Sequence, residues 1–245
     1  MLKRVLRSGP VLLALLLSAC SQHPTPVEPI GVEATYRLLF NDALVGNALF
    51  ILQIEHDGSY RIDAFTTPAG QMQRADGHEV LESSRGRIDS EGVRPQHFEH
   101  SVMTNEQTEV SKLVFDWDKR VLRIDGKKSK HAAALPPGTQ DHLSYLLTAR
   151  QLALQGKGSV KLQIASADAN EHTQLQVVGQ EAIDVPLGHH DTLAIRRLTS
   201  LPNEIRALWF DTGLSPLPLR VVHGWAGNTV DMQLESLSQL PVRPH

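Results

Sequence analysis

The chain has 245 residues, of which 41% are hydrophobic and 5% aromatic, and its 24 Lys and Arg against 27 Asp and Glu give a formal net charge of −3. Without a stripe of basic residues to neutralise phosphates, no nucleic-acid partner is expected. The only cysteine is Cys20, which excludes a disulfide within the chain.

The first 19 residues have the parts of a secretory signal. Lys3, Arg4 and Arg7 form a positively charged start, and residues 11–17 form an apolar run of seven residues. A membrane-spanning helix needs roughly 20 apolar residues, so this run is too short to span a bilayer. The pattern therefore predicts a cleaved signal peptide over residues 1–19.

Cys20 directly follows Leu17, Ser18 and Ala19. This order resembles the lipobox of bacterial lipoproteins, and the resemblance implies diacylglycerol on the Cys20 thiol, removal of the leader and acylation of the new N-terminus. Several acyl chains on one residue attach a protein lastingly to a bilayer. We therefore predict lipidation at Cys20 and a membrane partner through this anchor. An ordinary signal peptide that leaves a free thiol is the alternative.

Residues 20–30 combine the predicted lipidated N-terminus with a proline-rich tether, which contains Pro24, Pro26 and Pro29. Removal of the leader takes away three basic residues and no acids, so the mature charge is 21 − 27 = −6. In the lipoprotein resemblance, an aspartate after the cysteine favours the inner membrane, whereas this chain has Ser21. We expect placement in the cell envelope, at the outer membrane and facing the periplasm.

Residues 31–240 are predicted to form a single β-rich periplasmic domain, and residues 241–245 a short tail. Alternating apolar and polar residues dominate this region, at the spacing of antiparallel hairpins. The stretches predicted as strands are 34–40, 47–54, 60–66, 111–117, 120–126, 159–166, 173–179, 192–198, 205–211, 217–224 and 230–236. So many strands must close or curl to hide their edges. The predicted fold class is mainly β, with a large curved antiparallel sheet or open β-barrel.

One segment breaks the strand pattern. Leucines recur at helical spacing between residues 139 and 158 and predict one α-helix over about residues 141–155. Asp141 is the predicted helix cap at the N-terminus, and Gly156 is placed where the helix would end. We expect this helix to cover the open face or mouth of the curved sheet.

Four stretches resemble successive blocks of a bacterial envelope family of unknown function, numbered 3108 (DUF3108). They are residues 83–100, 141–152, 179–197 and 207–224. The resemblance covers about residues 33–238 and implies a β-rich curved sheet or barrel. It implies no activity, because none is established for the family.

Three large aromatic residues are candidates for a ligand-binding site. In a β domain, Trp209, Phe210 and Trp225 are able to line a cavity. Packing in the core explains large aromatic side chains equally well, and this structural interpretation stays open beside the functional one.

Catalytic and metal-binding patterns are weak. The chain contains no G-x-S-x-G, P-loop, G-x-G-x-x-G or H-E-x-x-H motif. Asp141, His142 and Ser144 come nearest to a catalytic cluster, but adjacent residues on a helix point apart, which favours helix capping. The histidine-rich stretches 97–100 and 189–190 are interpreted as surface histidines, so no metal and no cofactor are expected.

These observations predict a non-catalytic, lipid-anchored envelope protein that binds an apolar ligand or a partner protein of the envelope. A scaffold module with a filled interior is the main alternative, and an unrecognised hydrolase is the third hypothesis. A cavity that fits a small ligand would favour binding, and convergent acid–base groups in a cleft would favour hydrolysis.

Overall fold

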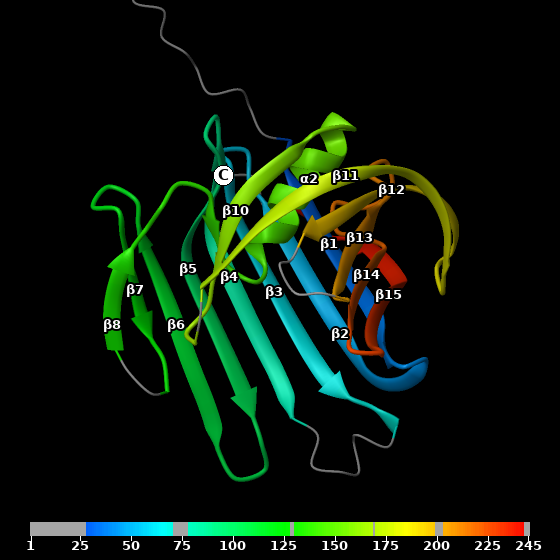
Figure 1. Ribbon diagram of the computed structural model, residues 1–245, viewed down its shortest axis with the longest axis horizontal. Helices are drawn as coiled ribbons and strands as arrows, with labels where there is room; N and C mark the ends of the chain where they lie inside the picture. Colours follow the sequence, from blue (N-terminus) through cyan, green and yellow to red (C-terminus); the bar gives the residue numbers. More distant parts are fainter. Residues whose placement is uncertain (1–27, 71–77, 128–129, 169, 199–202, 243–245) are drawn as a thin grey trace, which may run out of the picture.

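The computed structural model describes residues 28–70, 78–127, 130–168, 170–198 and 203–242 (Figure 1). Within them, fifteen strands belong to a single sheet. The elements are β1 (Ile30–Phe40), β2 (Ala43–Ile54), β3 (Ser59–Pro68), β4 (Glu79–Asp89), β5 (Gly92–Met103), β6 (Thr108–Asp116), β7 (Val121–Asp125), β8 (Lys130–Ala134), β9 (Thr139–Gln140), α2 (Ser144–Gln155), β10 (Ser159–Ala165), β11 (Asn170–Val185), β12 (Gly188–Leu198), β13 (Ile205–Phe210), β14 (Arg220–Trp225) and β15 (Asn228–Gln239).

The sheet is built from two meanders that meet in its middle. Its order is β8-β7-β6-β5-β4-β3-β2-β1-β15-β14-β13-β12-β11-β10-β9. The strands pair antiparallel, apart from β9 and β10, which are parallel. The first and last strands are neighbours, and the Leu240 N–H donates to the Gly31 carbonyl at 2.8 Å. Because β8 and β9 are the two ends of this order, the sheet is open.

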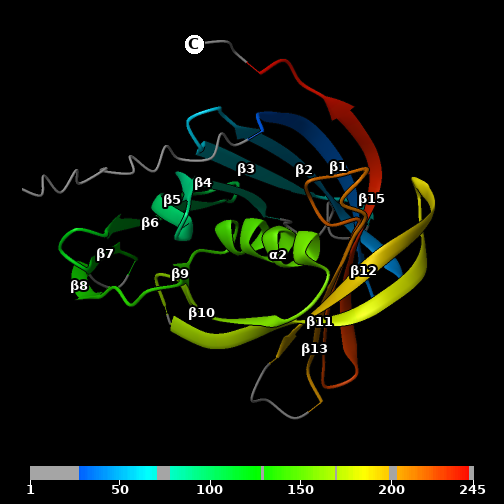
Figure 2. The same ribbon diagram turned by 90° about the horizontal axis from the view of Figure 1, so that it is seen from above.

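The sheet curls, and helix α2 lies inside the curve (Figure 2). It contacts β5, β10, β11 and β12, which belong to both meanders. Register shifts bend the strands at Thr35/Tyr36, Arg85/Gly86 and Val177/Gly179, as β-bulges do. Among the described residues, no helix is both long and apolar enough to cross a membrane.

The concave face of the sheet carries the core. Val32, Ala34 and Tyr36 are buried on β1 and alternate with more exposed residues. The Tyr36 hydroxyl donates to the Pro218 carbonyl at 3.0 Å. Buried leucines of α2, including Leu147, complete this core. Each fully buried large apolar side chain contributes about 1.5–3 kcal/mol, so the apolar alternation explains why these strands form and why they curl around the helix.

The structure confirms a mainly β, large and open antiparallel sheet. Each stretch predicted as a strand overlaps an observed strand. Several boundaries were wrong: β14 begins at Arg220 rather than at residue 217, and the helix begins at Ser144 rather than near residue 141. The structure also adds β8 and β9, and it shows that residues 79–103 form the long strands β4 and β5.

Candidate functional site

A buried polar cluster fixes the start of α2 to the sheet. The Asp141 carboxylate accepts the backbone N–H groups of Leu143 and Ser144, both at 2.8 Å. Its second oxygen accepts the Ser84 hydroxyl of β4 at 2.7 Å, and the Tyr60 hydroxyl lies 3.2 Å from that of Ser84. Burial raises the pKa of Asp141. The predicted capping residue thus bonds the turn before the helix and also links that turn to β4.

A second polar contact joins the turn before α2 to the same strand. On β4, Glu82 lies two residues before Ser84 and therefore on the same face of the sheet. Its carboxylate is 3.1 Å from Nδ1 of His100 on β5 and 3.8 Å from Nδ1 of His142. Burial alone would raise the pKa of Glu82, but hydrogen bonds and charge from the two histidines outweigh it and lower that pKa to about 2. Glu82 is therefore ionised at neutral pH.

Charged residues of the other meander form a network on the same concave face. Arg206 on β13 bonds Glu171 at 2.8 Å and Glu204 at 2.6 Å. Arg197 on β12 bonds Glu171 at 2.5 Å, and Nε2 of His223 lies 2.7 Å from Glu204. Burial would lower the pKa of Arg206, but the two glutamates raise it. Both guanidinium groups are charged, and one carboxylate, that of Glu171, lies between them.

Tyr145 connects the helix with this network. The Arg197 guanidinium lies 5.4 Å from the centre of the Tyr145 ring, within the range of a cation–π contact. Burial raises the pKa of the Tyr145 hydroxyl, although Arg197 and Arg206 oppose this. The Nε of Arg197 is buried and has no hydrogen-bond partner among the described residues. The start of α2 is therefore linked to β4 through Asp141, in the turn before the helix, and to β12 through Tyr145, in the first helical turn.

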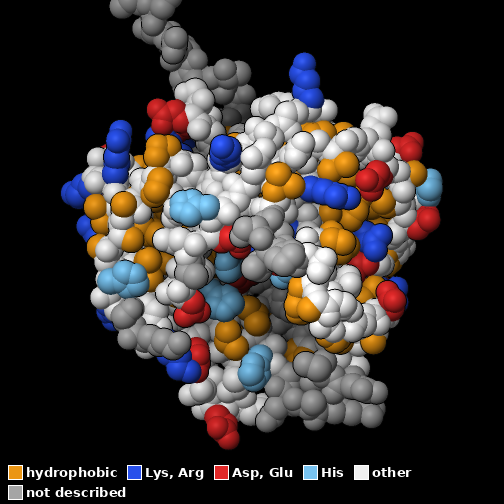
Figure 3. All heavy atoms as spheres, in the orientation of Figure 1, with side chains coloured by type: hydrophobic (Ala, Val, Ile, Leu, Met, Phe, Trp, Pro, Cys, Tyr) orange, Lys and Arg blue, Asp and Glu red, His pale blue; other side chains and the backbone are white. Residues whose placement is uncertain are grey.

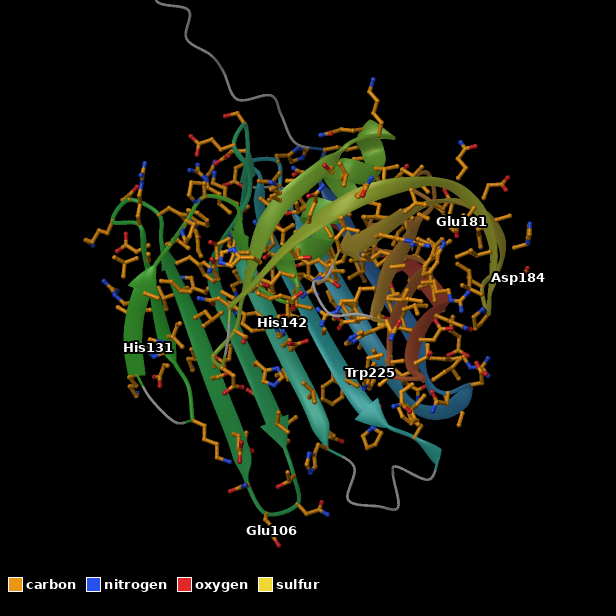
Figure 4. The ribbon with its side chains drawn as sticks, in the orientation of Figure 1. Glu106, His131, His142, Glu181, Asp184 and Trp225 are labelled. Atoms are coloured by element: carbon orange, nitrogen blue, oxygen red, sulfur yellow. The ribbon has the colours of Figure 1, made fainter. Side chains whose placement is uncertain are left out.

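The network lines an open cleft of about 380 Å³ between α2 and strands β11–β14. Figure 3 shows histidines gathered at the centre of this face, beside a hollow bordered by acidic and apolar side chains. His142 is labelled at that centre in Figure 4. The polar lining is that of the network, and Leu208 and Val221 add apolar surface. A cleft with two guanidinium groups and an apolar wall is suited to binding a molecule that has an anionic end and an apolar end.

The three aromatic residues predicted to line a ligand cavity do not converge on one. Phe210 is buried in the core, whereas its neighbour Trp209 lies on the opposite face, where its Nε1 donates to Glu181 at 2.7 Å. Trp225 is 37% exposed, and its ring centroid is 4.8 Å from that of His223. Figure 4 shows Trp225 near the middle of the face and Glu181 on the β11–β12 hairpin at its periphery. Trp225 contacts His223, a residue of the cleft.

The remaining candidate residues are also separated. His189 lies 2.9 Å from Asp184, and His190 lies 3.6 Å from Asp211. No group of three or more His, Cys, Asp or Glu side chains able to hold a metal ion occurs in the described ranges. The predicted lipidation residue, Cys20, lies outside the residues that the structure describes.

Sequence reasoning missed the charged residues of the cleft. Arg206 is in phase with Leu208 and Phe210 on β13, and Arg197 is in phase with Ile195 on β12. A charged residue on the apolar phase of a predicted strand is the signal that identifies such positions. His223 has the same relation to its strand, because it is two residues from a core-packed valine.

Comparison with known proteins identifies a family but no activity. The family described as "Protein of unknown function (DUF3108)" matches residues 34–235. A comparison with curated proteins found no match. A similar solved structure is that of a β-barrel-like protein of domain of unknown function DUF1849 from Brucella abortus, with a TM-score of 0.57 and 12% identity, covering 86% of this chain and 98% of that one. This likeness concerns the fold alone. The family match covers most of the chain, which therefore belongs to the DUF3108 family.

Proposed function

We propose that the mature protein is a lipid-anchored, non-catalytic protein of the bacterial cell envelope that binds an amphiphilic ligand with an anionic head group in the cleft beside α2. In this proposal α2 covers the concave face of the sheet and forms one wall of the site. The observation that carries the proposal is the pair Arg197 and Arg206, which share the carboxylate of Glu171 on the cleft surface.

The accessibility of the two glutamates supports the choice of an anion. The side chain of Glu204 is 4% exposed, whereas that of Glu171 is 37% exposed. A carboxylate or phosphate that enters from solvent therefore meets the guanidinium groups where Glu171 now occupies them. Bidentate contacts of this kind are strong and specific for planar or tetrahedral anions.

Apolar side chains next to the charged residues support the proposal that the ligand also has an apolar part. Leu208 and Val221 line the cleft, and the ring of Trp225 packs against His223 and lies 6.3 Å from that of Phe40. Phe40 and Trp225 are each 37% exposed. An entirely apolar ligand would leave the charged wall without partners, at an energetic cost, so the ligand class that we propose is amphiphilic.

A titration with paired ligands tests this proposal. Dodecyl phosphate and dodecyl maltoside share an apolar chain, but only the first carries an anionic group. Calorimetry below their micellar concentrations should show saturable binding of dodecyl phosphate to the Cys20→Ala chain and much weaker binding of the maltoside.

Two substitutions with opposite expected effects sharpen the test. Arg197→Met should weaken dodecyl phosphate binding by about tenfold or more, because it removes a charge-assisted contact. Glu171→Gln should strengthen it, since the competing carboxylate is lost. Arg196→Met, at the exposed neighbouring position, is the matched control and should change nothing. Equal binding of both detergents, or weaker binding by Glu171→Gln, would contradict the proposal.

The anchor is tested separately. Cys20→Ala should move the protein from the membrane fraction to the soluble periplasmic fraction, and the mass of the mature wild-type protein should exceed that of the cleaved chain by its acyl groups. Extraction of lipids that co-purify with the folded Cys20→Ala domain would then identify natural ligands. If Cys20→Ala stays in the membrane fraction, the anchor assignment is wrong.

One observation supports the alternative hypothesis that the domain is a scaffold module with a filled interior. The core is a continuous cluster that extends from β1 through α2 to β14 and β15, as expected of a domain whose interior is filled by its own side chains. The same titration separates the two functions, because a scaffold with a filled interior would bind neither detergent at the cleft.

A further inference from the structure

A second and larger groove lies along the later turns of α2. It has a volume of about 720 Å³ and is bounded by α2, the β4–β5 and β6–β7 turns, and β10. It shares no lining residue with the cleft described above. Its chemistry is also different, because uncharged hydrogen-bonding groups line the helix side.

The helix presents a row of such groups to the groove. Thr148, Gln151 and Gln155 all line it, and their spacing of three and four residues places them along one face of α2. A glutamine amide both donates and accepts hydrogen bonds, and a threonine hydroxyl does the same. A ligand that matches this row must offer donors and acceptors together, which is the property of a hydroxyl-rich molecule.

Two atoms at the groove lack hydrogen-bond partners. Gln140 is 3% exposed, and its Nε2 donates to the Val93 carbonyl at 2.8 Å. Its Oε1 and the Thr148 Oγ1 are buried and have no partner within the part of the chain that the structure describes. Buried polar atoms are nearly always paired, so these two atoms call for a water or a ligand hydroxyl at the groove.

An aromatic ring and apolar side chains complete the lining. Trp117 stacks on Phe115 at 6.4 Å with an interplanar angle of 13°, and its Nε1 donates to the Pro95 carbonyl at 2.6 Å. These contacts fix the ring at the groove, where Leu135 and Leu154 also lie. A fixed indole beside aliphatic side chains offers a surface for the C–H face of a sugar ring.

Charge at the groove is largely compensated within the protein. Arg94 pairs with Asp89 and with Glu91, all three on the β4–β5 hairpin. The other charged lining residues, Arg120 and Lys161, are exposed. The groove thus lacks a buried unpaired charge that would select a small ion.

We infer that this groove binds a saccharide, with its hydroxyl groups on Thr148, Gln151 and Gln155 and a ring face on Trp117. The inference does not rest on the proposed function, since the two sites share no residue. A lipid chain would leave the amide row unpaired, whereas a saccharide offers both hydroxyl groups for that row and an apolar ring face for the indole.

Nuclear magnetic resonance of the full mature chain carrying Cys20→Ala tests the inference. The probes are a tetrasaccharide of N-acetylglucosamine, maltotetraose and a tetra-alanine peptide. At least one saccharide should shift the side-chain amide signals of Gln151 and Gln155 in a saturable manner, while the peptide leaves them unchanged.

The matched variants are Gln151→Met and Gln176→Met. The first removes an amide from the groove and should weaken saccharide binding by about tenfold; the second changes an exposed glutamine on β11 and should have no effect. Arg197→Met, which tests the other cleft, should also leave saccharide binding intact. Absence of saccharide-induced shifts, equal weakening by both glutamine variants, or saturable binding of the peptide instead would overturn the inference.

Discussion

At the scale of single residues, Ser83 and Ser84 show how neighbouring positions on a strand differ in role. Ser84 faces the core and donates to the buried Asp141 carboxylate at 2.7 Å, whereas Ser83 is part of the opposite face. Ser84→Ala removes a hydrogen-bond partner from the buried Asp141 carboxyl group, which costs about 1–3 kcal/mol. We expect urea denaturation to show this loss for Ser84→Ala and a change near zero for Ser83→Ala. Equal effects of the two substitutions would contradict the assigned role of the cluster.

Glu82 should make stability depend on pH in a defined window. Its folded pKa of about 2 lies below the ordinary value of 4.5, so its stabilising contribution is complete above pH 4.5 and disappears as the pH falls toward 2. The hydrogen bond with Glu82 raises the pKa of His100 above 6.5, although burial opposes this, and that contribution is lost as the pH rises through the raised value. The free energy of unfolding of the wild-type protein should therefore exceed that of the Glu82→Gln variant. The difference should be largest, about 3 kcal/mol, between pH 4.5 and 6.5.

Denaturation curves across the acid and neutral ranges measure this difference. Glu79→Gln is the control, because Glu79 is an exposed residue of the same strand. The free energy of unfolding of Glu79→Gln should stay close to that of the wild-type protein at every pH. A difference for Glu82→Gln that grows as the pH falls below 4.5 would mean that Glu82 is not held in its charged form.

At the scale of elements, α2 ends as its sequence predicts. Gly156 has a φ of 70° in the left-handed region, and its N–H donates to the Ala153 carbonyl at 3.0 Å. A Cβ added there meets nothing within 4 Å, so Gly156→Ala should cost only the conformational strain, about 1 kcal/mol. Thermal denaturation should show a lower melting temperature for Gly156→Ala and almost no change for Lys157→Ala. A stabilised Gly156→Ala variant would exclude this cap geometry.

The sequence did not reveal β4 and β5, which carry the polar cluster beside the start of α2, whereas the cleft lies between α2 and strands β11–β14, which were all predicted. Strand β4 carries Glu82, Ser84 and Gly86 on its core-facing side, so it lacks the apolar alternation by which the other strands are predicted. A side chain on Gly86 would approach Pro95 Cα to 2.7 Å and the Tyr60 ring to 2.8 Å, which explains a glycine at the bulge. The polar residues of β4 bond the residues at the start of α2. Polar residues in a sequence pattern are usually interpreted as surface residues, so this strand was not predicted.

The residues of the candidate site also differ in how far the sequence alone predicts their roles. The sequence identified Asp141 as the helix cap, but the N-cap residue of α2 is Leu143, which makes no side-chain capping hydrogen bond, and the Asp141 carboxylate instead accepts the N–H groups of Leu143 and Ser144. The contact of Arg197 with Tyr145, and the sharing of Glu171 by Arg197 and Arg206, depend on how far the sheet curls, and local sequence carries no such information. Trp209 and Phe210 could have been separated in advance, since adjacent residues of a strand face opposite sides.

At the scale of the whole molecule, the two meanders of the open sheet meet at β1 and β15 in its centre and end at the edge strands β8 and β9. Strand β1 lies between β2 and β15, and three of its residues are almost completely buried. Strand β8 has one neighbour, β7, and most of its residues are exposed. The helix contacts both meanders, which meet where β1 pairs with β15.

Hydrogen exchange should follow this arrangement. Amides of β1 and β2 should exchange slowest, near the rate set by global unfolding, because these strands lie near the centre of the sheet and carry many buried apolar side chains. Amides of β8 should exchange fastest among the strands, because β8 is an exposed edge that opens without breaking the core. Native-state exchange measured by mass spectrometry with peptide resolution provides the test. Protection of β8 equal to that of β1 would mean that β8 has a second partner strand, as in a closed barrel, and would contradict the open sheet on which both proposed sites depend.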